Sequence, residues 1–259
     1  MPARIGLAVI VLLAVTALLG PLLAPHDPTE PIGAPFAGPG SGAILGTDFL
    51  GRDLLSRLLA GGWTVLLYAS VATALAYAFG LTIGLVAGYS RTPLDPALMR
   101  TADVLQSFPP LVFLLLLAAA VGRGQSAVVL GTAIIQAPFI ARIIRTATLQ
   151  QSVRGFVAAA VARGESTSSI LRREILPNIA APISADIGLR FTASVILIAS
   201  VNFLGLGLQP PAPDWGVMVS ENRAGIALNP MAMLAPAIIL GALTIALSVV
   251  SDAFVRGER

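Results

Sequence analysis

The longest uncharged stretch of the chain covers residues 58–90 and reads LLAGGWTVLLYASVATALAYAFGLTIGLVAGYS. Its 33 residues exceed the roughly 20 apolar residues that a helix needs to cross the hydrocarbon core of a bilayer. We therefore expect a long, tilted membrane-spanning helix at about residues 62–89. The composition agrees, because 56% of the 259 residues are hydrophobic and only 11% are charged, whereas soluble domains carry about 25% charged residues.

Apolar segments on both sides of this stretch predict an all-α polytopic membrane protein with about six transmembrane helices. The first is expected at residues 1–24, where the long apolar run without a clear cleavage site favours a span over a cleaved signal peptide. A connecting segment, residues 25–61, follows it. Residues 62–259 form the core, with spans expected at 62–89, 104–122, 124–141, 187–208 and 224–251.

The distribution of arginines orients these helices, since cytoplasmic loops are richer in basic residues than outer loops. With both chain termini in the cytoplasm, eleven arginines lie inside and four lie outside. This N-in, C-in arrangement makes residues 25–61 extracytoplasmic and places a cytoplasmic loop, at about residues 147–181, between spans four and five. The inside set is Arg4, Arg91, Arg100, Arg142, Arg145, Arg154, Arg163, Arg172, Arg173, Arg256 and Arg259, and the outside set is Arg52, Arg57, Arg123 and Arg223.

The residue types that are missing limit the chemistry of the chain. It has no cysteine, one histidine, and sixteen basic residues that are all arginine. The lack of lysine excludes both the phosphate-binding lysine of an ATPase P-loop and a Schiff-base enzyme. We therefore expect a chain that is not an enzyme and binds neither a metal nor another cofactor itself. Nucleic-acid binding is disfavoured, because the arginines are spread among apolar segments.

The cytoplasmic loop contains FVAAAVARGESTSSILRREILPN, residues 156–178, which predicts two short helices joined by a glycine. The alanines at 158–160 favour the first helix. Gly164 is suited to close that helix, because glycine readily adopts a positive φ angle. Ser166 or Thr167 is then expected to cap the second helix by accepting a bond from a backbone N–H group.

The second helix carries an apolar stripe of Ile170, Leu171 and Ile175, and we expect it to end at Pro177. The two helices then form a small elbow, edged by arginines, just below the membrane. Two roles are open on these residues alone. The elbow either docks into a groove on another protein or only connects two spans along the surface of the bilayer.

In this loop AAAVARG, residues 158–164, is followed nine residues later by EILPN, residues 174–178. The pattern resembles the EAA loop of ABC-importer permeases. It departs from that motif at Ala158, where the family has glutamate, and at Glu174, where peptide permeases usually have histidine. The resemblance implies an ATPase-coupling loop that includes Ala158, Ala159, Ala160, Gly164, Glu165, Ser166, Leu176 and Pro177.

Four further blocks occur in order along the chain: LGTDFLGRDLLSRLLAGG (45–62), DPALMRTADVLQSFP (95–109), NFLGLGLQPPAPDWGVM (202–218) and SDAFVRGE (251–258). Together they resemble the dipeptide/oligopeptide/nickel permease family, and within it the C-type subunit with a shorter outer domain. Ile198 departs from the family, whose members often carry an acidic residue there. The resemblance covers most of the chain from residue 45 onward.

This resemblance implies a transmembrane permease subunit of an ATP-driven importer that carries dipeptides or oligopeptides across the cytoplasmic (inner) membrane of a bacterium. Nickel or glutathione-like compounds are the alternative substrates. The implied partners are a second homologous permease, ABC ATPase subunits that bind ATP and Mg, and an extracytoplasmic substrate-binding protein. Two rival classes are a self-contained secondary transporter, for which we find no inverted repeat and no charges in the central spans, and a membrane enzyme, for which we find no catalytic groups.

Three polar residues of the fifth span are candidates for the substrate path: Asp186, Arg190 and Asn202. Charged residues inside a membrane are often functional. Asp186 and Arg190 are four residues apart, however, so a self-neutralising helical pair is the favoured alternative. For Asn202 the favoured alternative is a hydrogen bond that packs the helix against a neighbour.

The outer segment and the third span carry two further predictions. Asp48, Arg52 and Asp53 are expected to form a local ion-pair cluster, in preference to touching a binding protein. His26 is expected to be a solvated loop residue. The pair Pro109-Pro110 is expected to kink the third span, because proline disrupts the helical hydrogen-bond ladder.

Overall fold

The computed structural model describes residues 2–40, 42–90 and 93–256, and its regular elements in these ranges are all helices. Five helices are long and apolar enough to cross a membrane. They are α1 (Pro2–Leu23), α2 (Leu54–Ser90), α5 (Gln125–Ser152), α9 (Ala180–Phe203) and α11 (Pro230–Arg256). Arg91 and Arg259, which count toward the predicted orientation, lie outside the described residues.

The expected third span is broken into two helices, α3 (Leu94–Gln106) and α4 (Pro110–Val121), which are bent by 90° relative to each other. The break coincides with Pro109 and Pro110, as expected, because a proline disfavours helical geometry in the residue before it. The predicted kink is confirmed as a full break. The bundle therefore has five spans, or six if the bent pair counts as one, which agrees with the predicted number.

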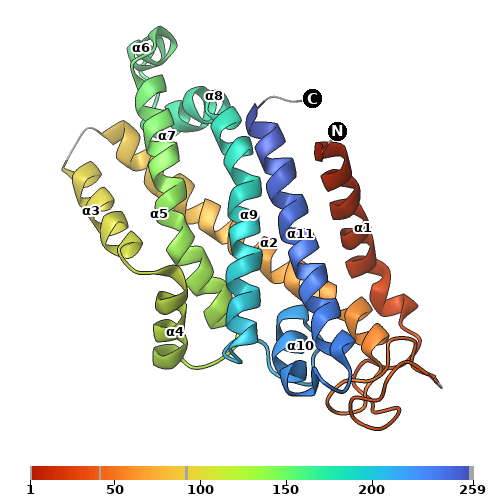
Figure 1. The fold of residues 1–259 in the computed structure, drawn as a ribbon. Coiled ribbons are helices and arrows are strands. Elements are labelled where there is room, and N and C mark those ends of the chain that lie inside the picture. Colours follow the sequence, from red (N-terminus) through yellow and green to blue (C-terminus); the bar gives the residue numbers. More distant parts are fainter. Residues whose placement is uncertain (1, 41, 91–92, 257–259) are drawn as a thin grey trace.

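The helices α2 and α5 lie against each other in the bundle (Figure 1). They pack through a stripe of glycines on α2. A Cβ atom added to Gly80 or Gly84 would lie 2.6 Å from the Cβ of an isoleucine on α5, Ile140 or Ile144 respectively. A Cβ atom on Gly88 would lie 2.8 Å from a backbone carbonyl oxygen of α5. Small residues spaced by four positions let two helix backbones approach closely in a membrane, and only glycine fits here.

The start of α2 differs from the expected start of the second span. The helix begins at Leu54, inside the range assigned to the connecting segment. Asp53 caps it, because its Oδ2 accepts hydrogen bonds from the backbone N–H and the hydroxyl group of Ser56, at 3.2 and 2.5 Å. The first turns of α2 therefore belong to the range that was assigned to the connecting segment.

The two ends of the bundle are built differently (Figure 1). One end, which we call the elbow pole, holds the start of α1, the end of α11 and the segment between α5 and α9. That segment contains α6 (Gly155–Ala162), α7 (Thr167–Ser169), the π-helix η1 (Ile170–Ile175) and α8 (Leu176–Asn178). The other end, the loop pole, holds residues 24–40 and 42–53, α10 (Trp215–Asn222) and the 3-10 helix η2 (Arg223–Gly225).

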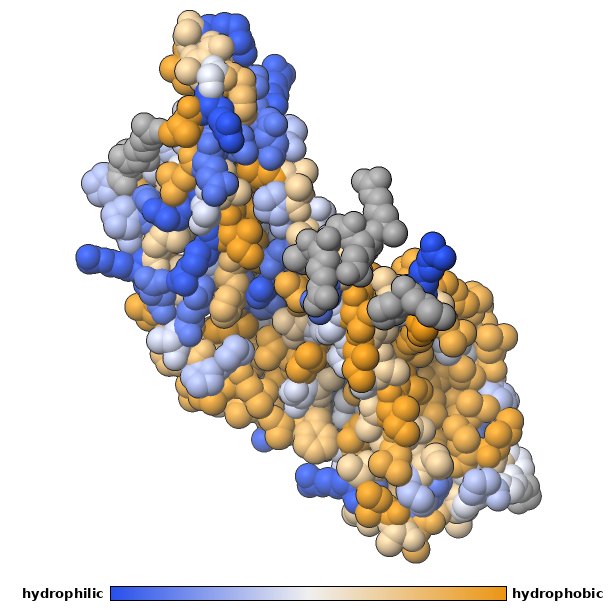
Figure 2. All heavy atoms as spheres, turned by 45° about the horizontal axis from the view of Figure 1, so that its top comes forward, coloured by the Kyte–Doolittle hydropathy of each residue, from blue (hydrophilic) through white to orange (hydrophobic). Residues whose placement is uncertain are grey.

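In the view of Figure 2, hydrophilic side chains gather at the elbow pole and down the side below it, whereas the rest of the visible surface is mostly apolar with scattered hydrophilic residues. Both ends of the described chain lie at the elbow pole (Figure 1). This position of the two ends agrees with the prediction that both termini lie on the same side of the membrane.

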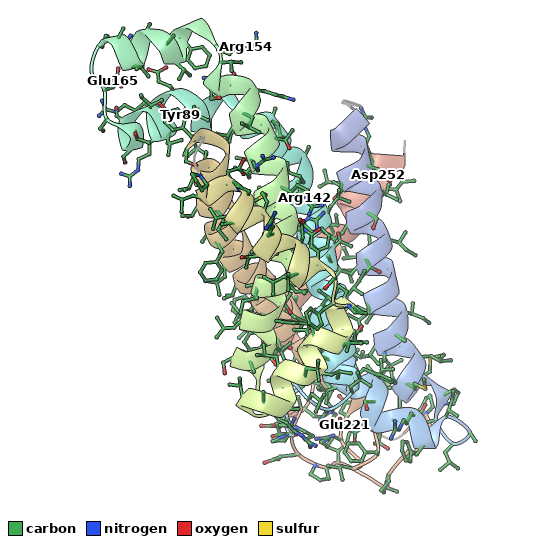
Figure 3. The ribbon with its side chains drawn as sticks, turned by 90° about the vertical axis from the view of Figure 1, so that its left-hand side faces the viewer. Tyr89, Arg142, Arg154, Glu165, Glu221 and Asp252 are labelled. Atoms are coloured by element: carbon green, nitrogen blue, oxygen red, sulfur yellow. The ribbon has the colours of Figure 1, made fainter. Side chains whose placement is uncertain are left out.

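A buried ion cluster fixes the loop pole. Arg52 Nε lies 2.7 Å from Asp48 Oδ2, and Arg57 Nε lies 3.3 Å from the same oxygen. Both arginines also reach Glu221 Oε2, at 3.2 Å for Arg52 and 2.9 Å for Arg57. The predicted local cluster is confirmed for Asp48 and Arg52, and Glu221 connects it to α10 (Figure 3).

His26 is not the solvated loop residue that we expected. Its side chain is 35% exposed, and its Nδ1 lies 3.2 Å from Asp53 Oδ2. Its backbone N–H also donates a hydrogen bond to the hydroxyl oxygen of Ser56. The expectation was wrong because the loop that follows α1 returns to the start of α2.

Candidate coupling site and substrate path

The elbow, residues 153–179, turns at a glycine (Figure 3). Gly164 follows the end of α6 and adopts a φ angle of +77°, as predicted. Its N–H donates to the carbonyl oxygen of Val161 at 2.9 Å, and the N–H of Glu165 donates to that of Ala160 at 3.1 Å. These two bonds satisfy carbonyl groups that the end of α6 leaves without a helical partner.

The second arm of the elbow begins at Ser166, whose hydroxyl oxygen accepts a hydrogen bond from the backbone N–H of Ser169. The predicted cap is confirmed, and the capping residue is Ser166. The arm continues as a π-helix from Ile170 to Ile175. The arm ends at Asn178, one residue after the predicted end at Pro177. That proline lies in the first turn of α8, where its missing N–H leaves no helical bond unmade, and α9 begins two residues after α8.

Apolar side chains fasten the elbow to the transmembrane helices. Val157 and Ala160 of α6 are buried together with Ile170 and Ile175 of the second arm. They belong to one cluster with Ile144 of α5 and with further residues of α2 and α5. Burying a side chain such as isoleucine stabilises by about 1.5–3 kcal/mol. The two arms are therefore held as one unit against the ends of α2 and α5.

An arginine bridges the two arms on the outside. The Arg163 Nη2 atom lies 2.5 Å from Glu165 Oε1 and 3.5 Å from Glu174 Oε1. The hydroxyl group of Ser169 donates to the second carboxylate oxygen of Glu165 at 2.9 Å. The bonds from Arg163 and Ser169 lower the pKa of Glu165 below its ordinary value of 4.5. Glu174, one of the two departures from the family motif, thus contacts the same arginine.

The outward face of α6 is apolar and is framed by positive charge. Phe156, Ala158, Ala159 and Val161 are exposed on it. The exposed arginines of the elbow are Arg154, Arg163, Arg172 and Arg173. Such a surface is complementary to a groove with an apolar floor and an acidic rim.

The eight predicted coupling residues differ in exposure. All of them lie in the elbow, which is the region where the sequence predicted them. Ala160 is buried, and Glu165 and Leu176 are half-buried. The exposed ones, which are available to a partner protein, are Ala158, Ala159, Gly164, Ser166 and Pro177.

Asp186 and Arg190 form the predicted helical pair, with Arg190 Nε 3.0 Å from Asp186 Oδ1. The hydroxyl group of Tyr77 on α2 donates to the other carboxylate oxygen at 2.9 Å. The guanidinium carbon of Arg190 also lies 5.3 Å from the ring centroid of Phe139 on α5. The helix α9 begins at Ala180, earlier than the expected start at residue 187, and so contains both members of the pair.

Asn202 lies at the other end of α9 and contacts both the following turn and the start of α10. Its Oδ1 accepts a hydrogen bond from the backbone N–H of Leu208 at 3.0 Å, and its side chain is buried. This bond goes to the turn that follows α9. The side chain also interacts with Asp214, which caps the neighbouring helix α10, so the expected contact with a neighbouring helix is present. The structure therefore brings Asp186 and Arg190 together but places Asn202 apart from them, toward the loop pole (Figure 1).

A cluster of three hydrogen-bonded polar side chains inside the bundle was not predicted from the sequence. The hydroxyl oxygens of Thr73 on α2 and Ser194 on α9 lie 2.8 Å apart, and the amide of Gln136 on α5 donates to Ser194 at 2.6 Å. All three side chains are buried. Such bonds join helices inside a membrane. The available signal was the presence of uncharged polar residues in otherwise apolar spans.

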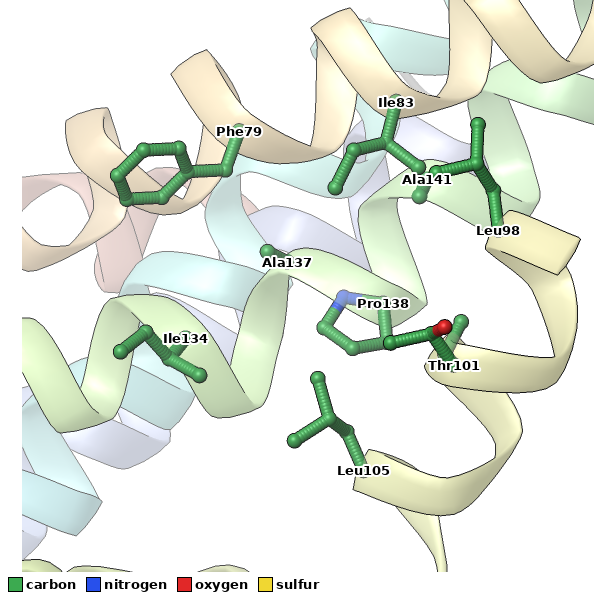
Figure 4. A pocket seen from close by; sticks show the side chains of 10 residues that line it. Phe79, Ile83, Leu98, Thr101, Leu105, Ile134, Ala137, Pro138 and Ala141 are labelled. Atoms are coloured by element: carbon green, nitrogen blue, oxygen red, sulfur yellow. The ribbon is translucent and has the colours of Figure 1, made fainter. Parts of the chain in front are cut away.

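Two cavities adjoin α3 and α5. The smaller one, of about 230 Å³, lies between α2, α3 and α5 and is lined almost entirely by apolar groups, among them Phe79, Leu105 and Pro138 (Figure 4). The larger one, of about 540 Å³, lies between α3, α5 and α9. Its lining includes Arg142 and Arg190 and is much more polar. The second cavity therefore offers hydrogen-bonding groups that the first lacks.

The sequence matches two family profiles. Residues 80–257 match the binding-protein-dependent transport system inner membrane component, and residues 1–39 match the N-terminal TM domain of oligopeptide transport permease C. Among solved structures, the chain is similar to the inward-facing MetNI methionine ABC transporter, with a TM-score of 0.61, 21% identity, and coverage of 78% of this chain and 95% of that one. This likeness supports the fold.

Curated relatives agree with the profiles. The chain is 34% identical to the Di/tripeptide transport system permease protein DppC of Pseudomonas aeruginosa, over 84% of this chain and 74% of that one. It is 35% identical to the Glutathione transport system permease protein GsiD of Pectobacterium atrosepticum, over 83% and 71%. It is 31% identical to the Dipeptide transport system permease protein DppC of Alkalihalophilus pseudofirmus, over 96% and 83%. The chain therefore belongs to the binding-protein-dependent transport system inner membrane component family, as a permease of the dipeptide/oligopeptide group of ABC importers.

Proposed function

We propose that this chain is one of two permease subunits through which short peptides enter a bacterial cell across the cytoplasmic membrane. The relatives are named as permeases for dipeptides, di/tripeptides or glutathione, and these are the substrates to test first. In this proposal the elbow pole faces the cytoplasm and the loop pole faces outward. The excess of arginines predicted for the cytoplasmic side supports this orientation.

The observation that carries the proposal is the way in which the elbow is attached. It continues directly from α5 and leads directly into α9, and its apolar stripe is buried against α2 and α5. A push on the exposed face of α6 is therefore passed to the ends of three spanning helices. Closure of partner ATPases then needs only to favour one of two packings of those helices.

The energy for transport comes, in this proposal, from other subunits. The chain has no lysine, so it cannot supply the lysine of a P-loop, and ATP and Mg are bound by the partner ATPases. An extracytoplasmic binding protein delivers the peptide, and a second, homologous permease completes the path. This assignment separates the chain from a secondary transporter, which carries its own coupling sites.

Reconstitution in lipid vesicles tests the proposal. The chain is co-expressed with its partner permease and ATPases, and uptake of a labelled dipeptide and of glutathione is measured with the binding protein and ATP. We expect uptake of at least one of these peptides, and none when either ATP or the ATPase subunits are omitted. Uptake by the permease alone would identify a secondary transporter. ATP-driven transport of neither peptide would refute the substrate assignment.

A further inference from the structure

The cavity between α3, α5 and α9 is lined by polar side chains from all three helices. Arg142, Thr146 and Gln150 reach it from successive turns of α5, Gln106 from the end of α3, and Arg190 from α9. Figure 2 shows hydrophilic side chains continuing from the elbow down one side of the molecule, and Figure 3 places Arg142 below the elbow. Arginines and glutamines are unfavourable against lipid tails, so this cavity requires water or a polar ligand.

The charged residues in the described lining of the cavity are both arginines, and each is paired with a carboxylate that lies outside the lining. Of the described residues that line it, two are arginines and none is acidic. Arg142 is 52% exposed and contacts Asp103, which is 61% exposed and lies outside the lining. Arg190 contacts Asp186 on one side and the ring of Phe139 on the other. Each guanidinium has five N–H donors, so a single carboxylate partner leaves donors for an anion in the cavity.

An unused donor at the end of α3 adds to this surface. The side-chain nitrogen of Gln106 is buried and has no hydrogen-bond partner among the described residues. Buried amide donors are nearly always paired in folded proteins. Its position in the lining supplies a reason, since a bound ligand with oxygen acceptors would satisfy it.

The cavity is also placed where the elbow can act on it. Gln150 lies two residues before the end of α5, where the elbow begins, and Pro182 lies at the start of α9, shortly after the elbow ends. The two attachments of the elbow thus flank the cavity. A movement of the elbow relative to α3 changes its width.

We propose that this arginine cavity is a station on the substrate path and binds the C-terminal carboxylate of the peptide through Arg142 and Arg190. This inference rests on the proposed function and adds a chemical requirement to it. The carboxylate is common to all unmodified linear peptides, so the cavity recognises the class of substrate and not its side chains. With no acidic group in the described lining, the cavity makes no ion pair with the amino end of the peptide.

A thiol in the cavity provides a direct test, because the chain has no cysteine of its own. Thr146 is exposed and lines the cavity, so Thr146→Cys introduces one reporter. Labelling of this chain is measured in the complete reconstituted complex, with thiosulfonates of equal size and opposite charge. We expect the anionic reagent to react faster by about tenfold, the effect of one charge-assisted contact. We expect Arg142→Gln to remove most of that preference.

Arg145→Gln is the matched control. Arg145 lies one turn further along α5 and also contacts a carboxylate on α3, that of Asp95, but it does not line the cavity. This variant should keep the preference for the anionic reagent. Equal labelling by both reagents in the chain that carries Thr146→Cys alone, or an equal loss of the preference on adding Arg142→Gln or Arg145→Gln, would overturn the proposal.

Ligand protection identifies the bound group. A dipeptide and its N-acetyl derivative should both slow labelling, whereas the dipeptide with an amidated C-terminus should not. Protection by the amidated dipeptide would overturn the proposal. Protection only by anionic phospholipid in the vesicle would also overturn it, because the site would then bind a lipid headgroup. If the complex transports dipeptides and none of them protects, this inference alone fails. If no peptide is transported, the proposed function fails first.

Discussion

The two poles of this permease hold their shape by different interactions. At the loop pole, Arg52 and Arg57 are fully buried between Asp48 and Glu221. At the elbow pole the ion pairs are mostly exposed, as at Arg163, and a small apolar cluster packs the elbow against α2 and α5. Exposed ion pairs contribute about 0–1 kcal/mol, whereas breaking a buried pair costs about 3–5 kcal/mol.

This difference fits two tasks. A buried ion cluster has one acceptable geometry, because any shift leaves a charge without its partner in a dry site. An apolar stripe capped by exposed charges tolerates small rotations with little change in energy. The loop pole is therefore suited to staying fixed, and the elbow is suited to moving as a unit on the ends of α2 and α5.

The largest effect is expected from Arg57→Met at the loop pole. The change leaves Glu221 with Arg52 alone and removes one of the two arginines that contact Asp48, so it should destabilise the fold by about 3–5 kcal/mol. The thermal midpoint of the purified protein in detergent measures it. Arg123→Met, at an exposed residue, should change stability by no more than about 0.5 kcal/mol. Equal midpoints in the two variants would show that the loop pole is not held by its ions.

The next largest effect is expected where α2 meets α5. A Cβ atom at Gly84 would lie 2.7 Å from the carbonyl oxygen of Ala141 and 2.6 Å from the Cβ of Ile144, so Gly84→Ala should cost about 1–3 kcal/mol by forcing the helices apart. Gly241→Ala on α11 is the control, because its Cβ atom would meet nothing within 4 Å. Alanine is the better helix former, so the control should be neutral or stabilising. A stable Gly84→Ala protein would mean that α2 and α5 can separate freely.

Much of this architecture could be predicted from the sequence because each step had a local cause. Uncharged runs predicted the spans, Gly164 and Ser166 predicted the turn and cap of the elbow, and the Asp186–Arg190 spacing predicted a helical pair. In each case the decisive contact lies within a few residues along the chain.

The features that escaped prediction depend on contacts between distant segments. Glu221 joins the cluster at Arg52 from α10, and Gln136 meets Ser194 from another helix. The arginine cavity could not be predicted because its lining comes from three helices, and neither Arg142 nor Gln106 indicates a cavity by its position in the sequence.

A moderate effect is expected from Gly164→Ala in the elbow. The added Cβ has open space around it, but the φ angle of +77° costs an ordinary residue about 1–2 kcal/mol. The turn should distort while the spans remain folded, so peptide uptake should fall more than ATP hydrolysis in the reconstituted complex. Gly155→Ala, at the start of α6 and likewise free of contacts, should leave both rates unchanged. Matched losses of uptake and hydrolysis would indicate failed assembly instead of lost coupling.

The smallest effect is expected from the ion contact that bridges the arms of the elbow. The pKa of Glu165 is lowered by bonds from Arg163 and Ser169, so this contact is complete above the ordinary glutamate pKa of 4.5 and is lost as the pH falls through the lower, folded value. Hydrogen exchange at residues 164–169, corrected for the intrinsic rate, should show less protection at about pH 3 than at about pH 6. Glu165→Gln should remove most of that difference. Because the apolar cluster that holds the elbow against α2 and α5 is uncharged, the elbow should stay packed on these helices at both pH values. If the elbow detached from them in acid, its ion pairs would be the main anchor.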